Sequence, residues 1–159
     1  MKKKLNKVAK DTNNFLKNYL KKQKKTKLID PIRYGLFPGG KKIRVKILVD
    51  IGKILLVPYR HLIRIGAAIE CIHAYSLIHD DLPCMDNDNL RRGKLTTHKK
   101  FSESTAILAG NSLLTIAFQI LSEKGLNLEI VYDSDMLSKL FPTCSASGPV
   151  IIFIKAPKP

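Results

Sequence analysis

The segment from Tyr59 to Asp80 constrains the fold most, because its apolar side chains recur at the three- and four-residue spacing of one helical face. This spacing holds for Leu62, Ile65, Ile69 and Ile72, and Leu77 follows five residues further on. An adjacent pair of alanines within the segment favours close packing against another helix. Asp80 and Asp81 end the segment, and Pro83 pushes the residue before it out of the helical region. The pattern therefore predicts a long, packed helix that ends in two carboxylates.

Carboxylates at the C-terminal end of a helix are unfavourable, because the helix dipole already places partial negative charge there. The chain nevertheless adds Asp86 and Asp88, followed by Arg91 and Arg92. Clustered carboxylates suit Mg²⁺, which accepts one or two of them beside substrate phosphates, and guanidinium groups pair bidentately with phosphate oxygens. The segment therefore predicts a metal-bridged diphosphate site. A solvated acidic turn is one alternative, and a calcium loop without the EF-hand spacing of glycine and glutamate is another.

A glycine-rich segment upstream, residues 39–44, offers a second anion site. Two glycines are followed there by three cations, Lys41, Lys42 and Arg44. Cations at the start of a helix add to the attraction that its free backbone N–H groups exert on anions. On the long helix, one stripe contains Glu70, His73, Leu77 and Asp80 or Asp81. We therefore expect His73 to point toward the same cavity as the aspartates, with a packed core histidine as the alternative.

The other segments are assigned from chain breakers and apolar periodicity. Residues 31–42 contain five prolines and glycines and are predicted to form a loop. Residues 43–57 are apolar and β-branched, a pattern that permits either a strand or a helix. Residues 85–100 are predicted to form a polar loop. Residues 104–121, which are apolar on nearly all sides, are predicted to form a buried helix.

Positive charge is concentrated at the N-terminus. Residues 1–27 hold eleven lysines and a single acidic residue, Asp11, while their apolar residues keep helical spacing. This pattern predicts an amphipathic helix that either binds anions or a membrane surface, or packs on the protein with a solvated basic face. The formal net charge of the whole chain is +15, which favours an anionic partner such as nucleic acid, a phosphate ester or an acidic membrane.

Composition excludes several other classes. The three cysteines are too few and too irregularly spaced for a disulfide framework, so reduced thiols and a cytoplasmic location are the simpler interpretation. No stretch reaches the roughly 18 consecutive apolar residues of a spanning helix, so no membrane span is expected. The lysine-rich start also lacks the apolar core of a secretory signal.

Taken together, residues 39–44, the segment 72–86 and the Arg-Arg-Gly at 91–93 resemble trans-polyprenyl diphosphate synthases. Within that family the resemblance is to the bacterial farnesyl diphosphate synthase branch, and it runs from about Arg33 to Leu128. It implies an all-α fold, an isoprenoid-synthase-type helical bundle around a central cavity. It also implies a cytoplasmic enzyme whose intact members form homodimers, and it gives no reason to expect a nucleic-acid partner.

The resemblance also implies roles for individual residues. Asp80 and Asp86 would hold Mg²⁺ that bridges an allylic diphosphate, with Asp81 nearby as a further catalytic carboxylate. Arg91 would bind the allylic diphosphate. Isopentenyl diphosphate would be bound by Lys41, Arg44, His73 and Arg92. The metal would then supply the positive charge that the helix end lacks.

The implied reaction is the ionisation of dimethylallyl or geranyl diphosphate to an allylic carbocation. The double bond of isopentenyl diphosphate attacks this cation, a proton is lost, and farnesyl diphosphate results. Tyr75 and Ser76 lie five and four residues before Asp80, where the growing prenyl tail would extend. The Tyr75 ring would form the floor that limits product length, and core packing of this ring is the alternative.

The chain also departs from the family pattern. A second aspartate-rich motif is absent, and Val45 and Leu95 stand where prolines are usual. We therefore expect residues 1–128 to be the N-terminal part of a polyprenyl synthase domain, and residues 129–159 to be an unrelated or frameshifted tail. Three interpretations remain open: a prenyltransferase represented by its N-terminal half, an inactive fragment with one diphosphate half-site, and a basic nucleic-acid-binding module.

Overall fold

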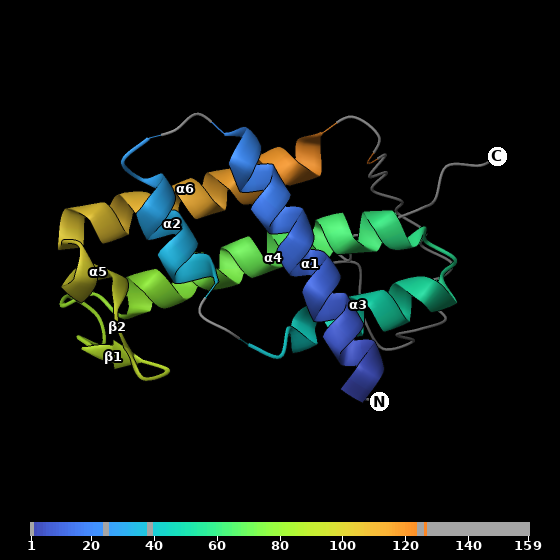
Figure 1. Ribbon diagram of the computed structural model, residues 1–159, viewed down its shortest axis with the longest axis horizontal. Helices are drawn as coiled ribbons and strands as arrows, with labels where there is room; N and C mark the ends of the chain where they lie inside the picture. The colour runs from blue at the N-terminus through green and yellow to red at the C-terminus, as the bar shows by residue number, and fades with distance from the viewer. Residues whose placement is uncertain (1, 24–25, 38–39, 124–125, 127–159) are drawn as a thin grey trace, which may run out of the picture. The chain divides into compact units, whose positions relative to one another are not determined.

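The computed structural model describes residues 2–23, 26–37, 40–123 and 126, and the predicted tail 129–159 lies outside them. The chain divides into two units, residues 1–123 and 124–159, and the described helices and strands belong to the first. These elements are α1 (Lys2–Lys22), α2 (Ile29–Leu36), α3 (Ile43–Ile54), α4 (Tyr59–Asp80), β1 (Leu90–Arg91), β2 (Lys94–Leu95), α5 (Thr97–Lys100) and α6 (Glu103–Ser122). The described part of the chain is therefore mainly helical, as predicted (Figure 1).

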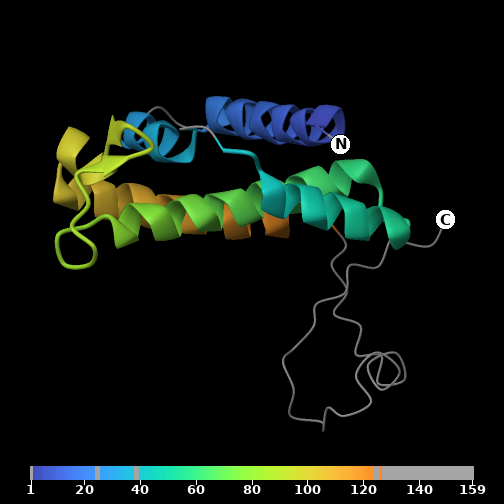
Figure 2. The same cartoon turned by 90° about the horizontal axis from the view of Figure 1, so that it is seen from below.

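α4 is the central helix of the first unit, because α1, α2, α3 and α6 all pack against it. Figure 2 shows α1 and α2 on one side of a layer that contains α3, α4 and α6. α4 extends over the residues that the sequence pattern predicts, and both predicted alanines, Ala67 and Ala68, are buried. At Gly110 of α6, a Cβ atom would lie 2.4 Å from Nε2 of His79 on α4. A larger residue at this position would therefore require the His79 side chain to move.

α1 is the predicted amphipathic helix. Its apolar side chains Val8, Leu16, Tyr19 and Leu20 are buried, whereas most of its lysines are exposed. Burying a side chain such as Leu16, which is 0% exposed, typically contributes about 1.5–3 kcal/mol. The packing of this apolar face therefore attaches the basic helix to the rest of the unit.

Two predicted loops are wrong in part. Residues 29–36 form helix α2, because Pro31 lies in the first helical turn, where its missing N–H costs no hydrogen bond. Within residues 85–100, β1 and β2 form a hairpin whose two turn residues, Arg92 and Gly93, both have positive φ, and α5 follows it. For residues 43–57, helix α3 settles the choice between helix and strand.

α6 is a helix as predicted, but it is not buried on nearly all sides. Ile107, Leu108 and Phe118 are 40%, 52% and 62% exposed. Of the helices in the described residues, α6 alone is long and apolar enough to cross a membrane by length and composition. A core helix of a soluble bundle passes the same test, and the α6 residues Ala109 and Leu113 are fully buried in the core with α4.

Candidate functional site

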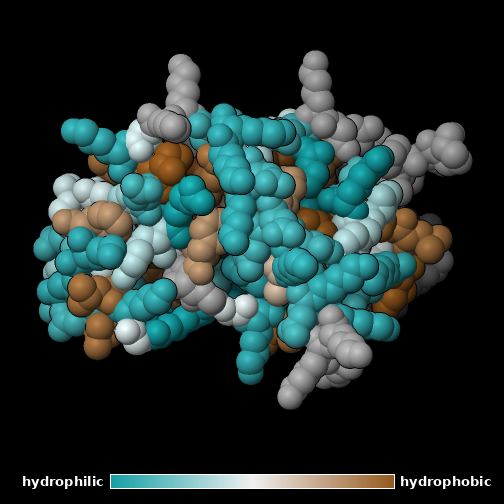
Figure 3. Space-filling view, viewed as in Figure 1, coloured by the Kyte–Doolittle hydropathy of each residue, from teal (hydrophilic) through white to brown (hydrophobic). Residues whose placement is uncertain are grey.

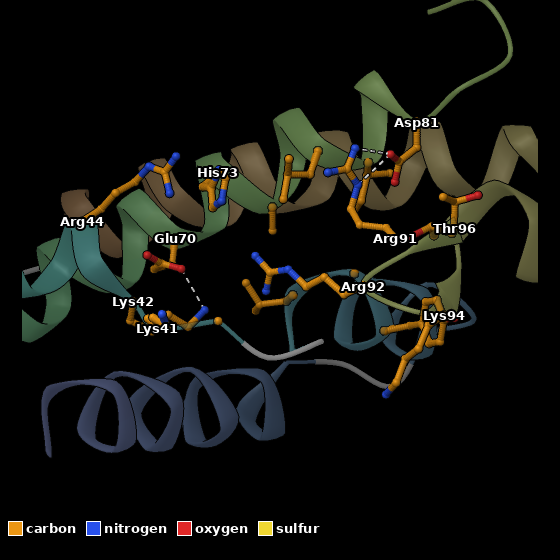
Figure 4. A pocket seen from close by; sticks show the side chains of 18 of the residues that line it. Lys41, Lys42, Arg44, Glu70, His73, Asp81, Arg91, Arg92, Lys94 and Thr96 are labelled. Atoms are coloured by element: carbon orange, nitrogen blue, oxygen red, sulfur yellow. Dashed lines mark hydrogen bonds and ion pairs between the residues drawn. The ribbon is translucent and has the colours of Figure 1, made fainter. Parts of the chain in front are cut away.

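A cavity of about 260 Å³ lies where α2, the start of α3, α4 and the β1–β2 hairpin meet (Figure 4). Six basic side chains line it: Lys41, Lys42, Arg44, Arg91, Arg92 and Lys94. Among its described lining residues the acidic side chains are Glu70 and Asp81. This excess of positive charge in a partly enclosed space suits an anionic ligand. The two anion sites that the sequence predicts separately, residues 39–44 and the arginine pair, thus belong to one cavity.

α4 contributes one stripe of side chains to this cavity. Glu70, His73, Leu77 and Asp81 lie along it at three- and four-residue steps, as the sequence predicts. Asp80 is not among the residues that line this cavity. It lies seven residues after His73, within about 20° of it around the helix, so the prediction that Asp80 and His73 face one cavity stays a prediction.

Lys42 and Glu70 form an ion pair at the edge of the cavity. The Lys42 Nζ atom lies 2.8 Å from Glu70 Oε2, and the two side chains are only 7% and 6% exposed. Lys42 precedes α3 with a left-handed backbone conformation (φ 48°). The pair joins the segment before α3 to the middle of α4. The sequence analysis counts Lys42 among the cations of the second anion site and Glu70 on the stripe of α4, but it does not predict that the two residues form a pair.

Arg91 is held by Asp81 at the end of α4. The Arg91 guanidinium donates from Nε to Asp81 Oδ1 at 2.7 Å, and Asp81 is 3% exposed. This hydrogen bond raises the pKa of Arg91 further above its ordinary value. The sequence reasoning leaves the charge at the helix end to a metal. The structure adds Arg91 as a compensating charge beside Asp81, and the metal expected at this helix end stays a prediction.

Arg92 comes close to Gly40 across the cavity. Gly40 has φ +147°, and a Cβ atom there would lie 2.8 Å from Nη1 of Arg92. Arg92 is itself a turn residue of the hairpin with φ 56°. Glycine at position 40 therefore serves two purposes, the backbone conformation and the space that the guanidinium occupies.

His73 is surrounded by cations. Burial is the main cause that lowers its pKa, and Arg44, Arg92 and Lys42 lower it further, while Glu70 acts in the opposite direction. The imidazole is therefore neutral near pH 7, and it offers the cavity one hydrogen-bond donor and one acceptor.

The aspartate loop folds back on the end of α4. The backbone N–H of Asp86 donates to the carbonyl oxygen of Asp80 at 2.9 Å. Asp80 is half-buried and Asp86 is exposed, and neither lines the cavity. Within the described residues, no three histidine, cysteine or acidic side chains gather closely enough to form a metal cluster. Two carboxylates nevertheless match Mg²⁺ in kind, since this ion usually takes one or two of them with water and substrate phosphates.

The proposed chain-length residues also lie outside the cavity. The Tyr75 ring packs against the His79 ring with centroids 4.5 Å apart, and its Cδ2 would lie 3.4 Å from a Cβ at Gly110 of α6. Ser76 donates its hydroxyl to the backbone carbonyl of His73 at 2.9 Å. The structure thus places these two residues on other sides of α4.

Thr96 is a lining residue that the sequence reasoning misses. Its hydroxyl donates to the carbonyl oxygen of Asp88 at 2.8 Å and lies 3.1 Å from Nδ1 of His98. Its backbone N–H donates to Asn89 at 3.0 Å. Thr96 is 2% exposed, so these bonds close the loop that carries Arg91 and Arg92. No periodic pattern marks this residue, and only recognition of the hairpin turn could have pointed to it.

The comparisons with known proteins agree with this geometry. Farnesyl diphosphate synthase from Buchnera aphidicola is 44% identical over 125 residues, which are 78% of this chain and 44% of that protein. The Escherichia coli farnesyl diphosphate synthase is 47% identical over 123 residues, 77% of this chain and 40% of that protein. An FPP/GFPP synthase structure from Zymomonas mobilis has a TM-score of 0.72 at 42% identity, covering 77% of this chain and 45% of that one.

These matches confirm the predicted all-α, isoprenoid-synthase-type fold. The chain spans less than half the length of these relatives. The family model for polyprenyl synthetase matches residues 25–142, which is most of the chain. The chain therefore belongs to the polyprenyl synthetase family.

Proposed function

We propose that the cavity binds isopentenyl diphosphate and that the chain provides this part of a prenyltransferase, one that condenses isopentenyl diphosphate with an allylic diphosphate. The observation that carries the proposal is the convergence of Lys41, Arg44 and Arg92 with a neutral His73 on one small cavity. The guanidinium groups pair with phosphate oxygens. His73 adds a hydrogen bond that does not depend on a further positive charge.

In this proposal the allylic diphosphate lies beside the aspartate loop. Asp80 and Asp86 are the residues that would hold Mg²⁺, and the bound metal would stabilise negative charge on the departing diphosphate. Arg91 contributes positive charge from the cavity side, where Asp81 fixes its orientation. The allylic C–O bond breaks and leaves pyrophosphate and an allylic cation. The double bond of isopentenyl diphosphate then forms the new C–C bond, and the adjacent carbon loses a proton.

A fifteen-carbon product is part of the same proposal. It is supported by the farnesyl diphosphate synthases among the relatives and by the position of Tyr75 one to two turns before Asp80. Tyr75 would limit the depth available to the prenyl tail, on a side of α4 other than the one that lines the cavity. The allylic substrate would then be dimethylallyl or geranyl diphosphate.

Calorimetric titration tests the binding step. Wild-type protein should bind isopentenyl diphosphate, and Arg92→Gln should weaken the affinity about tenfold or more, because a charge-assisted hydrogen bond contributes about 1.5–3 kcal/mol. Lys99→Gln is the matched control, since Lys99 is exposed on α5 and does not line the cavity. Equal losses in the two variants, or no binding by the wild type, would contradict the assignment of the cavity.

A second titration tests the metal. Dimethylallyl diphosphate should bind more tightly with Mg²⁺ than without it, and Asp80→Asn should remove most of that difference. Asp50→Asn provides the control, because Asp50 is an exposed residue of α3 that pairs with Lys46. An unchanged Mg²⁺ dependence in Asp80→Asn would reject the assignment of the aspartate loop.

A second candidate function is diphosphate binding without condensation. It is supported by the coverage of less than half of the curated relatives and by the single aspartate-rich loop among the described residues. Turnover of dimethylallyl and isopentenyl diphosphates distinguishes the two candidates. We expect the 159-residue chain to bind both diphosphates with little or no product formation, and robust turnover would exclude this second candidate.

A further inference from the structure

The outward side of α1 carries a stripe of four lysines, Lys7, Lys10, Lys17 and Lys21. They are spaced so that all four lie on one helical face, and all four are exposed. The buried residues of α1 occupy the opposite face. Asp11 lies beside the stripe, and its carboxylate accepts a hydrogen bond from the Tyr59 hydroxyl at 2.8 Å. The surface over α1 is accordingly hydrophilic in Figure 3.

Little within the described part of the chain offsets this charge. None of the four lysines forms an ion pair there, and Lys17 contacts only the Phe37 ring, at 6.0 Å from its centroid. Lys7 and Lys10 are three residues apart, and Lys17 and Lys21 are four apart, so each pair repels along the helix. The first turn of α1 also lacks the acidic residue that the helix dipole favours. The stripe is therefore unfavourable for the isolated helix, and an external anionic surface would relieve it.

We propose that this lysine stripe docks the protein on the surface of an anionic lipid bilayer. From Lys7 to Lys21 the helix extends about 21 Å in a straight line. α1 lies in the outer layer of the unit (Figure 2). Because the four lysines share one helical face, their ammonium groups can approach one plane together. Juxtaposed lysines of this kind are attracted to anionic headgroups within about a Debye length.

The binding mode is electrostatic and does not involve insertion. An interfacial helix inserts through an unoccupied apolar face, but Val8, Leu16 and Leu20 are already buried in the core.

A single-stranded nucleic acid fits the stripe less well, because stacking on its bases requires exposed aromatic rings. The aromatic residues of α1, Phe15 and Tyr19, stack on each other with centroids 6.0 Å apart and pack on the core. Docking is also independent of the proposed function, because no lysine of the stripe lines the cavity.

Vesicle co-sedimentation with the full chain tests the proposal. Vesicles of mixed phosphatidylcholine and phosphatidylglycerol should bind the protein at low salt, and pure phosphatidylcholine vesicles should not. The stripe variant is K7Q/K10Q/K17Q/K21Q, in which glutamine keeps the helix propensity close to that of lysine. Each lysine near an anionic surface contributes roughly fivefold in affinity, so this variant should lose well over tenfold.

The control variant is K4Q/K22Q/K27Q/K99Q, which removes four other exposed lysines. It should lose much less binding than the stripe variant. Equal losses would show that only net charge matters, and the proposal would be wrong. Failure of the wild type to bind anionic vesicles, with stripe-dependent binding to single-stranded RNA instead, would also overturn it. Thermal melts check that both variants fold, and the paired variants K7Q/K10Q and K17Q/K21Q should each show an intermediate loss.

Inorganic pyrophosphate separates this surface from the cavity. At matched ionic strength, pyrophosphate should leave vesicle binding unchanged, because its proposed binding residues are elsewhere. Displacement from the vesicles would assign the lipid contact to the cavity cations and reject the stripe. Vesicle binding that persists in Arg92→Gln, a variant of the cavity, would support the stripe even where diphosphate binding fails.

Discussion

The cavity and the outer face of α1 both carry dense positive charge, but the two regions treat it differently. In the cavity, Lys42 is paired with Glu70, and Arg91 is paired with Asp81, in each case with a buried acidic partner. On α1 the four lysines of the stripe are exposed and form no ion pairs within the described residues. The positive charge of the chain is therefore partly neutralised by buried carboxylates in the cavity, whereas on α1 it is left exposed to solvent.

Removing a partner from the cavity should have the largest effect. Glu70→Gln leaves the ammonium group of Lys42 buried without a counter-charge, which should lower the free energy of unfolding by about 3–5 kcal/mol. Asp50→Asn, which breaks the exposed pair with Lys46, should cost about 0.5 kcal/mol or less. Urea unfolding of both variants measures the difference.

The double variant Lys42→Met with Glu70→Leu sharpens this test. Replacing both members of a buried pair with apolar side chains is often neutral, so it should recover most of the lost stability. If Glu70→Gln and Asp50→Asn proved equally mild, the Lys42–Glu70 pair would contribute no more than a surface pair, and the contrast between the two regions would fail.

The contact between Gly40 and Arg92 should give the next largest effect. Gly40→Ala places a methyl group against the Arg92 guanidinium, so we expect isopentenyl diphosphate to bind about tenfold more weakly. The backbone φ at this position is one that side chains rarely adopt, so the substitution should also lower the free energy of unfolding by about 1–3 kcal/mol. Gly93→Ala is the matched control, because its φ is +75° but no atom lies within 4 Å of the added Cβ. Gly93→Ala should therefore cost stability and leave affinity nearly unchanged. If calorimetry showed equal affinities for the two variants, the contact between Gly40 and Arg92 would not contribute to the binding of isopentenyl diphosphate.

The long helices were predictable because each has many apolar residues in register. α4 begins and ends as predicted, since Pro58 precedes it and Pro83 follows shortly after it. The sequence pattern misses α2 because proline and glycine are typical chain breakers. Gly35 is instead a packing residue, and a Cβ atom there would lie 2.4 Å from the Ile78 side chain. Gly35 is therefore explained by close packing of α2 against α4 rather than by a turn.

The types of side chain in the site were predictable, but their pairing was not. Lys42 and Glu70 are 28 residues apart, and their contact depends on how the start of α3 packs beside α4. A helical period places both Asp80 and Asp81 near His73, and only the packing of α4 shows that Asp81 lines the cavity. Arg92 faces Gly40 because of a two-residue hairpin turn, a local feature with no apolar periodicity to reveal it.

The smallest effect on stability is expected for variants of α1, and it should be a gain in stability rather than a loss. Removing cavity partners destabilises the protein, but K7Q/K10Q should stabilise it slightly. Like charges three residues apart on a helix repel by about 0.2–0.5 kcal/mol, and removing this pair also reduces repulsion with neighbouring lysines. The gain should shrink as salt rises, because these side chains are exposed and their interaction is screened over about 10 Å at 0.1 M salt. K17Q alone adds a check, since Lys17 also contacts the Phe37 ring, and losing this contact should offset part of its gain. Thermal melts at low and high salt measure the stability of K7Q/K10Q and of K17Q relative to the wild type. If K7Q/K10Q melted below the wild type at low salt, Lys7 and Lys10 would stabilise the fold. The argument that an anionic surface relieves repulsion within the stripe would then be wrong.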